Sequence, residues 1–195
     1  MKEGRIDFYT VSEYNKFINA IDDAMYRMAF ELLFYTGCRC GELMALTVSD
    51  FDSTAKTINI NKNLAIVGKE VLVLSPKTPK SKRIIALPDK VNEHLKQYVG
   101  KMYEPKPNER IFPLINKHKL AEVVSKTSKK AVIKLIRVHD FLHSHASLLI
   151  ELGFSPLVIS ERLGHEDVKT TLSIYSHLYP TKAEEVAKKL NDFVN

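Results

Sequence analysis

The sequence predicts a mainly α-helical α+β domain with one small three-stranded antiparallel sheet. Three observations predict this class. Apolar residues recur at helical spacing before residue 57 and after residue 88. Between those positions, β-branched residues alternate with polar ones at period two. A chain of 195 residues that is 45% hydrophobic can also bury a sizeable core. We therefore expect a single domain over residues 1–195.

The amino-terminal part is expected to form three helices. Thr10-Val-Ser-Glu13 is a capping-box pattern, which opens a helix with one apolar face. Residues 24–35 are apolar on most faces, which predicts a buried central helix that ends at Gly37. A short third helix is expected over residues 40–46.

The sheet and the remaining helices follow in order. Three strands with β-branched alternation are separated by polar, turn-rich segments: Thr57–Ile60, Val71–Leu74 and Arg83–Leu87. Glycine and proline then punctuate a series of helical patterns, at 89–98, 117–136, 139–152, 156–163, 168–175 and 181–193. The last of these is amphipathic, so residues 181–195 are expected to form a tail helix.

Charge is distributed unevenly along the chain. Residues 51–140 carry 19 basic and 8 acidic side chains, against 5 and 8 before them and 5 and 7 after them. A basic excess confined to the middle of a chain favours a polyanionic partner such as DNA. No apolar run approaches a membrane span, and residues 1–7 show no signal-peptide pattern. We therefore expect a cytoplasmic protein, with no membrane partner.

Two basic motifs are candidates for phosphate binding. Arg39 follows the glycine helix stop, and Glu42 lies three residues on, where its carboxylate can hold the guanidinium fork. An ordinary surface ion pair is the alternative. The segment from Ser75 to Arg83 is rich in lysine and falls in the expected turn between two strands. Either this segment is a solvated loop that follows a phosphate backbone, or it holds Lys77 rigidly enough for Lys77 to donate a proton to a leaving oxygen. Lys80, Lys82 and Arg83 would then steer DNA.

Histidines and one tyrosine complete the set of candidates. His139 and His143 open a helix, where imidazoles can meet a phosphate. Their HxxxH spacing also allows a metal site, but no zincin glutamate or cysteine ligands accompany it, because Cys38 and Cys40 are expected to be free thiols. Tyr175 is either an ordinary core aromatic or a nucleophile that needs neighbours to accept its proton.

In order, these signals form a series of five boxes. That series closely resembles the catalytic domain of tyrosine recombinases, the phage integrase family, over nearly the whole chain from Thr10 to the final helix. The residues that carry the resemblance are Thr36-Gly-x-Arg39-x-x-Glu42-Leu, Lys77-Thr, His139-Asp-x-x-His143-Ser, Leu163-Gly-His165 and Thr-Leu-x-x-Tyr175-x-His177.

The resemblance implies a reaction and a role for each box. Tyr175 would attack a scissile DNA phosphate to give a 3′-phosphotyrosyl link and a free 5′-hydroxyl, with no metal, ATP or other cofactor. Lys77 would protonate the leaving oxygen, and His139 would assist proton transfer at the tyrosine. Arg39 and His165 would bind the non-bridging oxygens. Glu42 and His143 would support the site.

One position departs from the family pattern. The family has His-x-x-Arg in the fourth box, whereas this chain has Leu142 at the place of the second arginine. Arg137 lies on the wrong side of His139 to replace it. Because leucine cannot neutralise a pentacoordinate phosphorane, we expect severely impaired cleavage.

The resemblance also implies partners and leaves alternatives. Double-stranded DNA with attachment-type sites is the expected substrate, bound by a tetramer whose carboxy-terminal tails pack on their own domain or are exchanged between protomers. The expected setting is the nucleoid of a bacterial host. Core-binding and arm-binding domains do not fit before Thr10, so we expect an isolated catalytic domain with weak, salt-sensitive DNA affinity. A catalytically inactive DNA-binding homologue or regulator is the main alternative, and a type IB topoisomerase is a third.

Overall fold

The computed structural model describes residues 7–67, 70–75, 78–176 and 190–191. Within these ranges the chain is mainly helical, as predicted, and two of the predicted helices begin and end at the expected residues. The helices are α1 (Val11–Asn19), α2 (Ala24–Thr36), α3 (Cys40–Ala45), α4 (Asp89–Val99), α5 (Lys117–Lys130), α6 (Asp140–Glu151), α7 (Pro156–Leu163) and α8 (Val168–Tyr175). The expected tail helix at 181–195 lies almost wholly outside the described residues.

The local signals for helix ends act as expected. The Thr10 backbone N–H donates to Glu13 Oε2 at 2.9 Å, and the Glu13 N–H donates to Thr10 Oγ1 at 3.3 Å, which completes the capping box of α1. Gly37 ends α2 in the left-handed conformation at φ 63°. The helix expected over 117–136 is shorter than predicted. It ends at Lys130, because the chain turns at Val132, which has φ 52°.

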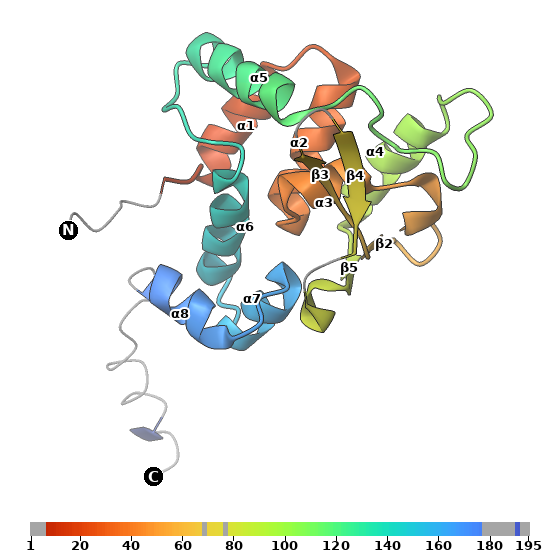
Figure 1. Ribbon diagram of the computed structural model, residues 1–195. Coiled ribbons are helices and arrows are strands. Elements are labelled where there is room, and N and C mark those ends of the chain that lie inside the picture. Colours follow the sequence, from red (N-terminus) through yellow and green to blue (C-terminus); the bar gives the residue numbers. More distant parts are fainter. Residues whose placement is uncertain (1–6, 68–69, 76–77, 177–189, 192–195) are drawn as a thin grey trace.

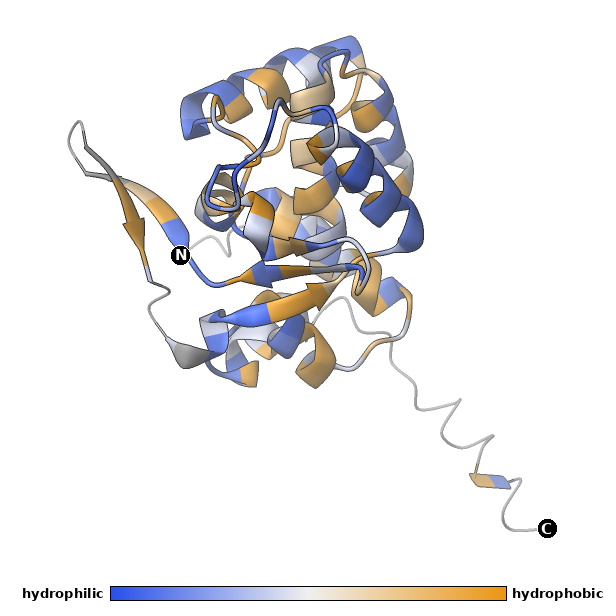
Figure 2. Ribbon diagram, turned by 90° about the vertical axis from the view of Figure 1, so that its right-hand side faces the viewer, coloured by the Kyte–Doolittle hydropathy of each residue, from blue (hydrophilic) through white to orange (hydrophobic). Residues whose placement is uncertain are grey.

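The small antiparallel sheet has three strands, but one of them was predicted wrongly. Its order is β1 (Phe51–Asp52), β2 (Thr57–Ile60) and β5 (Arg83–Ala86). The predicted strand at Val71–Leu74 instead belongs to a separate hairpin of β3 (Asn63–Val67) and β4 (Glu70–Leu74). Asn63–Val67, for which the sequence predicts no strand, provides a nearer partner. Figure 2 shows this hairpin standing out from the body of the domain.

Because β4 and β5 do not pair, the lysine-rich segment is not the tip of a hairpin. It connects the β3–β4 hairpin to the three-stranded sheet and includes a short 3₁₀ helix, η2, at Pro79–Ser81; a second 3₁₀ helix, η1, spans Val48–Asp50.

The domain has two apolar cores. The larger one is rich in aromatic residues and joins α1–α6 to the sheet. The smaller one is formed by Leu142, Ala146, Leu149, Ile150, Ile159, Leu163 and Tyr175. Figure 1 shows α6 running from the part of the domain that contains α1, α2 and α5 to the part that contains α7 and α8. The expected nucleophile is therefore a core residue of the smaller part. None of the helices described is long and apolar enough to cross a membrane.

Candidate active site

Arg39 is presented at the start of α3 by a tight turn. A Cβ atom at Gly37 would lie 2.6 Å from side-chain atoms of His145 and Leu163, so the glycine lets α2 end directly against α6 and α7. Arg39 is the N-cap residue of α3. Its backbone N–H donates to Glu42 Oε2 at 2.8 Å, and its Nη1 donates to Oε1 at 3.0 Å. The predicted arrangement, in which Glu42 holds the guanidinium, is therefore present.

Glu42 is shared between two arginines. Besides Arg39, it accepts hydrogen bonds from Arg83 Nη2 at 2.9 Å and Nη1 at 3.2 Å. Its side chain is only 5% exposed. Burial alone would raise the pKa of Glu42, but the hydrogen bonds and charge of Arg83, together with those of Arg39, hold that pKa below its ordinary value. The carboxylate is therefore ionised at neutral pH and can fix both guanidinium groups.

Arg83 differs from the lysines that precede it. Its side chain is 7% exposed, and its Nε donates to the carbonyl oxygen of Arg162 at 2.8 Å. The sequence predicts that Arg83 steers DNA, but this geometry favours a role inside the protein. Lys80 and Lys82 are exposed, as a DNA-steering role requires, and Lys80 Nζ also donates to the Glu166 carbonyl oxygen at 2.8 Å.

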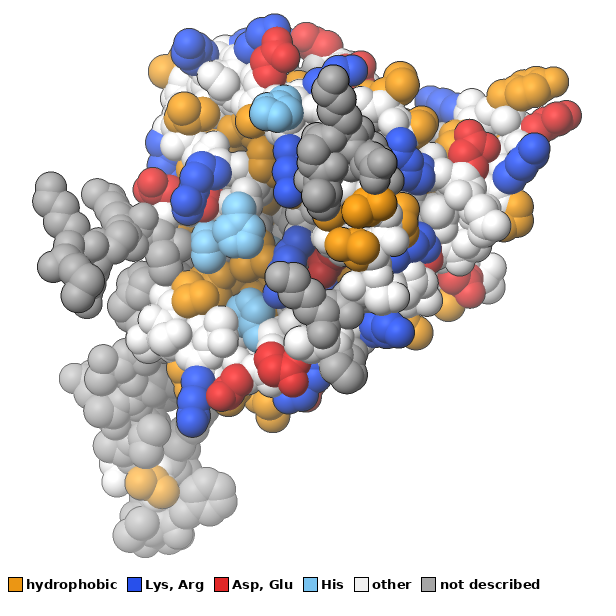
Figure 3. All heavy atoms as spheres, viewed as in Figure 1, with side chains coloured by type: hydrophobic (Ala, Val, Ile, Leu, Met, Phe, Trp, Pro, Cys, Tyr) orange, Lys and Arg blue, Asp and Glu red, His pale blue; other side chains and the backbone are white. Residues whose placement is uncertain are grey.

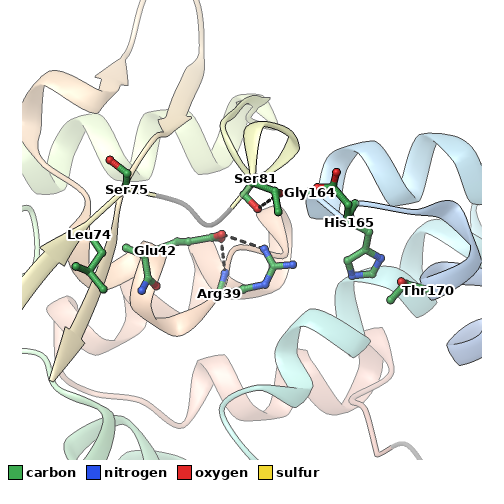
Figure 4. Close-up of a pocket in the computed structure, with 11 residues that line it drawn as sticks. Arg39, Glu42, Leu74, Ser75, Ser81, Gly164, His165 and Thr170 are labelled. Atoms are coloured by element: carbon green, nitrogen blue, oxygen red, sulfur yellow. Dashed lines mark hydrogen bonds and ion pairs between the residues drawn. The ribbon is translucent and has the colours of Figure 1, made fainter. Parts of the chain in front are cut away.

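A pocket of about 480 Å³ brings two of the predicted phosphate ligands together. Arg39 and His165 both line it, although 126 positions separate them in the sequence. In Figure 4, Arg39 lies between Glu42 and His165. Ser75 and Thr78 also line the pocket, whereas Lys77 lies outside the described residues.

His165 is held as a neutral hydrogen-bonding group. Its Nδ1 lies 2.8 Å from Thr171 Oγ1, which fixes the ring on α8. Burial, followed by the charges of Arg39 and Arg83, lowers the pKa of His165 to about 4. At neutral pH the ring can therefore bind a phosphate oxygen through Nε2–H when Nδ1 accepts from Thr171, but it adds no positive charge.

Tyr175 is fully buried in the smaller core. Its hydroxyl lies 2.6 Å from His143 Nδ1. Burial, reinforced by the charge of Asp140, raises the pKa of Tyr175, and burial also lowers the pKa of His143. The tyrosine is therefore protonated, and its hydroxyl donates to the neutral imidazole in the tautomer whose Nδ1 carries no proton. His139, the expected proton-transfer partner, is exposed at the start of α6, with its ring edge-on to His143 at 5.3 Å between centroids.

Leu142 lies in the same apolar core as Tyr175 and is only 4% exposed. The nearby Arg137 does not take its place, because its Nη2 pairs with Asp140 Oδ1 at 2.8 Å. Figure 3 shows histidine side chains gathered near the middle of one face, with hydrophobic side chains between them and lysine and arginine side chains around them. Neither Leu142 nor Arg137 therefore supplies the second guanidinium of the family pattern.

Arg162, which is not among the residues predicted for the site, ties α7 to three other segments. Its Nε donates to His145 Nε2 at 3.0 Å, and its Nη2 donates to the carbonyl oxygens of Tyr35 and Ala86, each at 3.1 Å. The only signal in the sequence is its place one residue before the Leu-Gly-His box, which says nothing of these partners. Among the described residues, no group of three or more histidine, cysteine or acidic side chains could hold a metal ion.

The His145–Arg162 contact predicts a loss of stability in mild acid. Burial, and then the charge of Arg162, lowers the pKa of His145 to about 3. Between pH 6.5 and about 3 the unfolded chain therefore binds a proton that the folded chain does not, so stability falls as pH falls. We expect the unfolding free energy to decrease by roughly 1 kcal/mol more between pH 6 and 5 than in His145→Gln. Urea denaturation measures both slopes, and equal slopes would contradict this assignment.

The comparisons with known proteins identify the family. The sequence pattern of the phage integrase family matches residues 7–182. The chain therefore belongs to the phage integrase family. Among individual relatives, this integrase domain is 32% identical over 204 residues to the ICEBs1 integrase of Bacillus subtilis strain 168, covering 97% of the chain and 55% of that relative. It is 31% identical over 186 residues to the integrase of Staphylococcus phage L54a, covering 85% and 51%. The chain thus spans about half the length of these relatives.

Solved structures of integrases share the fold. The Tn1549 transposon integrase in complex with circular intermediate DNA matches with a TM-score of 0.78 and 20% identity, over 100% of this chain and 69% of that one. The catalytic domain of bacteriophage HP1 integrase matches with a TM-score of 0.67 and 21% identity, over 98% of both chains. The predicted fold class, a tyrosine-recombinase catalytic domain with a small antiparallel sheet, is confirmed.

Proposed function

We propose that this integrase domain is the catalytic part of a site-specific DNA recombinase of a phage or other mobile element. The observation that carries the proposal is the pocket in which Arg39, fixed by Glu42, faces His165 from a distant part of the chain. A fixed guanidinium fork and a neutral imidazole are suited to two oxygens of one phosphate. The relatives support the same substrate, since the Tn1549 integrase was solved in complex with circular intermediate DNA.

In the proposed reaction, the Tyr175 oxygen attacks a scissile phosphorus while the bond from phosphorus to the 5′-oxygen breaks. The tyrosine loses its proton, and the leaving oxygen gains one from Lys77, so a 3′-phosphotyrosyl link and a 5′-hydroxyl form. Arg39 and His165 hold the non-bridging oxygens. Rejoining is the reverse attack by a 5′-hydroxyl, and neither direction consumes a cofactor.

The resting structure requires one rearrangement before attack. Tyr175 is fully buried and hydrogen-bonded to His143, so it must leave the smaller core to reach a phosphate. We propose that His143 holds the nucleophile in this resting position. His139, which is exposed, stays the proposed proton-transfer group once the tyrosine has moved.

Leu142 favours a second candidate function. Because the site lacks its second arginine, we propose that cleavage is severely impaired, and a catalytically inactive DNA-binding homologue or regulator is the alternative. A denaturing gel for covalent protein on DNA, run beside a native gel shift, separates the two. A shift without an adduct supports the inactive binder. Relaxation of supercoiled plasmids of any sequence would instead support a type IB topoisomerase.

We further propose that the domain acts at the nucleoid in the cytoplasm of a bacterial host, with attachment-type sites as DNA. Other recombinase protomers are the expected partners, in a tetramer on DNA, with carboxy-terminal tails exchanged between them. The tail lies outside the described residues, apart from 190–191. An isolated domain should bind DNA weakly and with a strong dependence on salt.

Lys82 provides a test of the proposed DNA contact. It is exposed, lines a second pocket that shares His165 with the first, and carries no catalytic role in the proposal. We expect Lys82→Gln to weaken binding to duplex DNA uniformly across sequences and to reduce the slope of log affinity against log salt by about 1. Lys96→Gln removes the same charge from exposed α4 and should change neither quantity. Fluorescence anisotropy at several salt concentrations measures both, and equal slopes for the two variants would contradict the contact.

A further inference from the structure

Arg83 is a buried guanidinium that joins segments on both sides of the pocket. Towards α3 it makes two hydrogen bonds to Glu42, which in turn holds Arg39. Towards its own segment, Nη1 donates to the Ser81 carbonyl oxygen at 3.1 Å. Towards α7, Nε donates to the carbonyl oxygen of Arg162 at 2.8 Å. One side chain therefore bonds to the partner of Arg39 and to the helix that leads into His165.

The contact with α7 is close at Gly164. This residue ends α7 with φ 66°, and a Cβ atom there would lie 3.0 Å from Arg83 Nη1 and 3.2 Å from Arg83 Cδ. A glycine at this position satisfies both the backbone conformation and the packing against Arg83. The turn that presents His165 therefore rests directly on the Arg83 side chain.

Arg162 makes the return contact. The Arg83 side chain binds the Arg162 backbone, and the Arg162 side chain binds the backbone of Ala86, three residues after Arg83 on β5. Two arginines thus cross-link β5 and α7 in both directions. Such a double link resists both sliding and rotation of α7 relative to the strand, because the two bonds join different points.

We propose that Arg83 is a positioning residue that fixes Arg39 and His165 relative to each other for binding a single phosphate. This inference rests on the proposed function, because it assumes that both residues bind the scissile phosphate. It assigns Arg83 no contact with DNA, for two reasons. Four hydrogen bonds within the protein occupy four of the five N–H donors of the guanidinium, and the side chain is only 7% exposed. Without Arg83, Glu42 would keep only its bonds to Arg39 and would no longer be linked through Arg83 to the backbone of α7.

Nuclear magnetic resonance of the full 195-residue chain tests the proposal without requiring DNA cleavage. Inorganic phosphate is titrated into labelled protein while the Arg39 and His165 side-chain signals are followed, and the pKa of His165 is measured separately. Arg83→Gln removes the charge and most of the bonds. Arg83→Lys keeps the charge but cannot reach Glu42 and Arg162 with one fork. Lys96→Gln is the control, because it removes one exposed positive charge from α4, away from the pocket.

We expect both Arg83 variants to weaken phosphate binding by about fivefold or more, and Lys96→Gln to weaken it by less than about twofold. Because Arg83 contributes to the low pKa of His165, Arg83→Gln should also raise that pKa towards 6.5. A general loss of stability would not by itself produce this titration shift. Phosphate affinity and His165 pKa that both stay unchanged in folded Arg83 variants would overturn the proposal.

The other possible outcomes also either support or overturn the proposed role of Arg83. If phosphate perturbs neither Arg39 nor His165 in the unmodified chain, the proposed phosphate site fails. The positioning role is then judged by the His165 pKa and ring tautomer in Arg83→Lys: a change supports it and no change overturns it. If Arg83→Gln does not fold, Arg83→Lys decides alone. An Arg83→Lys chain that cannot fold would overturn the proposal, because Arg83 would then be required by the fold itself.

Discussion

Replacing Leu142 with arginine is expected to accelerate formation of the covalent DNA adduct by about 100- to 1000-fold, the usual effect of one preorganised electrostatic group. The arginine would supply a second charged fork for the pentacoordinate phosphorane, which leucine cannot. It would also remove an aliphatic side chain from the core that buries Tyr175, and so favour release of the nucleophile. The rate is measured on nicked suicide duplexes tiled across the DNA that flanks the coding gene.

Leu142→Met is the control for this prediction. It keeps the position apolar and nearly conserves its volume, so it should leave the rate unchanged. An arginine variant that folds, binds DNA and yet forms adduct no faster than the unmodified chain would contradict the role assigned to position 142.

Removing the Glu42 carboxylate is expected to give the largest loss of stability. Glu42→Ala leaves the Arg83 guanidinium buried without its anionic partner, and breaking a buried ion pair in this way costs about 3–5 kcal/mol. Glu42→Gln keeps the volume and an acceptor oxygen, so its effect should be smaller. Urea denaturation measures the unfolding free energy of each variant.

An exposed ion pair provides the matched control. Asp89, with its side chain 84% exposed, pairs with Lys56 at 2.7 Å. Asp89→Ala should cost less than about 1 kcal/mol, as surface pairs do. If Glu42→Ala and Asp89→Ala destabilise the chain equally, the buried cluster is not the anchor that the geometry indicates.

The sequence predicted most of the fold, because the relevant signals are local. The capping box at Thr10 and the glycine stop at Gly37 depend on neighbouring residues alone, and α7 likewise begins at the Ser155 cap and ends at Gly164. Strand pairing, in contrast, depends on which segments lie side by side in the folded chain, and a local signal does not show this. The sequence therefore predicted that Val71–Leu74 is extended but not that it pairs with Asn63–Val67.

The site was predictable to the extent that the family motif fixes it. The pocket brings Arg39 and His165 together as expected, whereas the contact of Tyr175 with His143 rather than His139 was not foreseen. His139 and His143 are only four residues apart, so the sequence does not distinguish them. The packing of α8 against α6 determines which of the two contacts Tyr175. Arg83 was predicted to meet DNA because a cluster of basic residues gives no information about burial.

Identification of the DNA-linked peptide tests the central claim most directly. Leu142→Arg protein is trapped on a nicked suicide duplex, digested and analysed by mass spectrometry, with Leu142→Arg/Tyr175→Phe as the control. We predict a 3′-phosphate joined to Tyr175 and no adduct in the double variant. A link through another residue or to a 5′-phosphate, or a folded and DNA-bound Leu142→Arg protein that forms no adduct, would contradict the account.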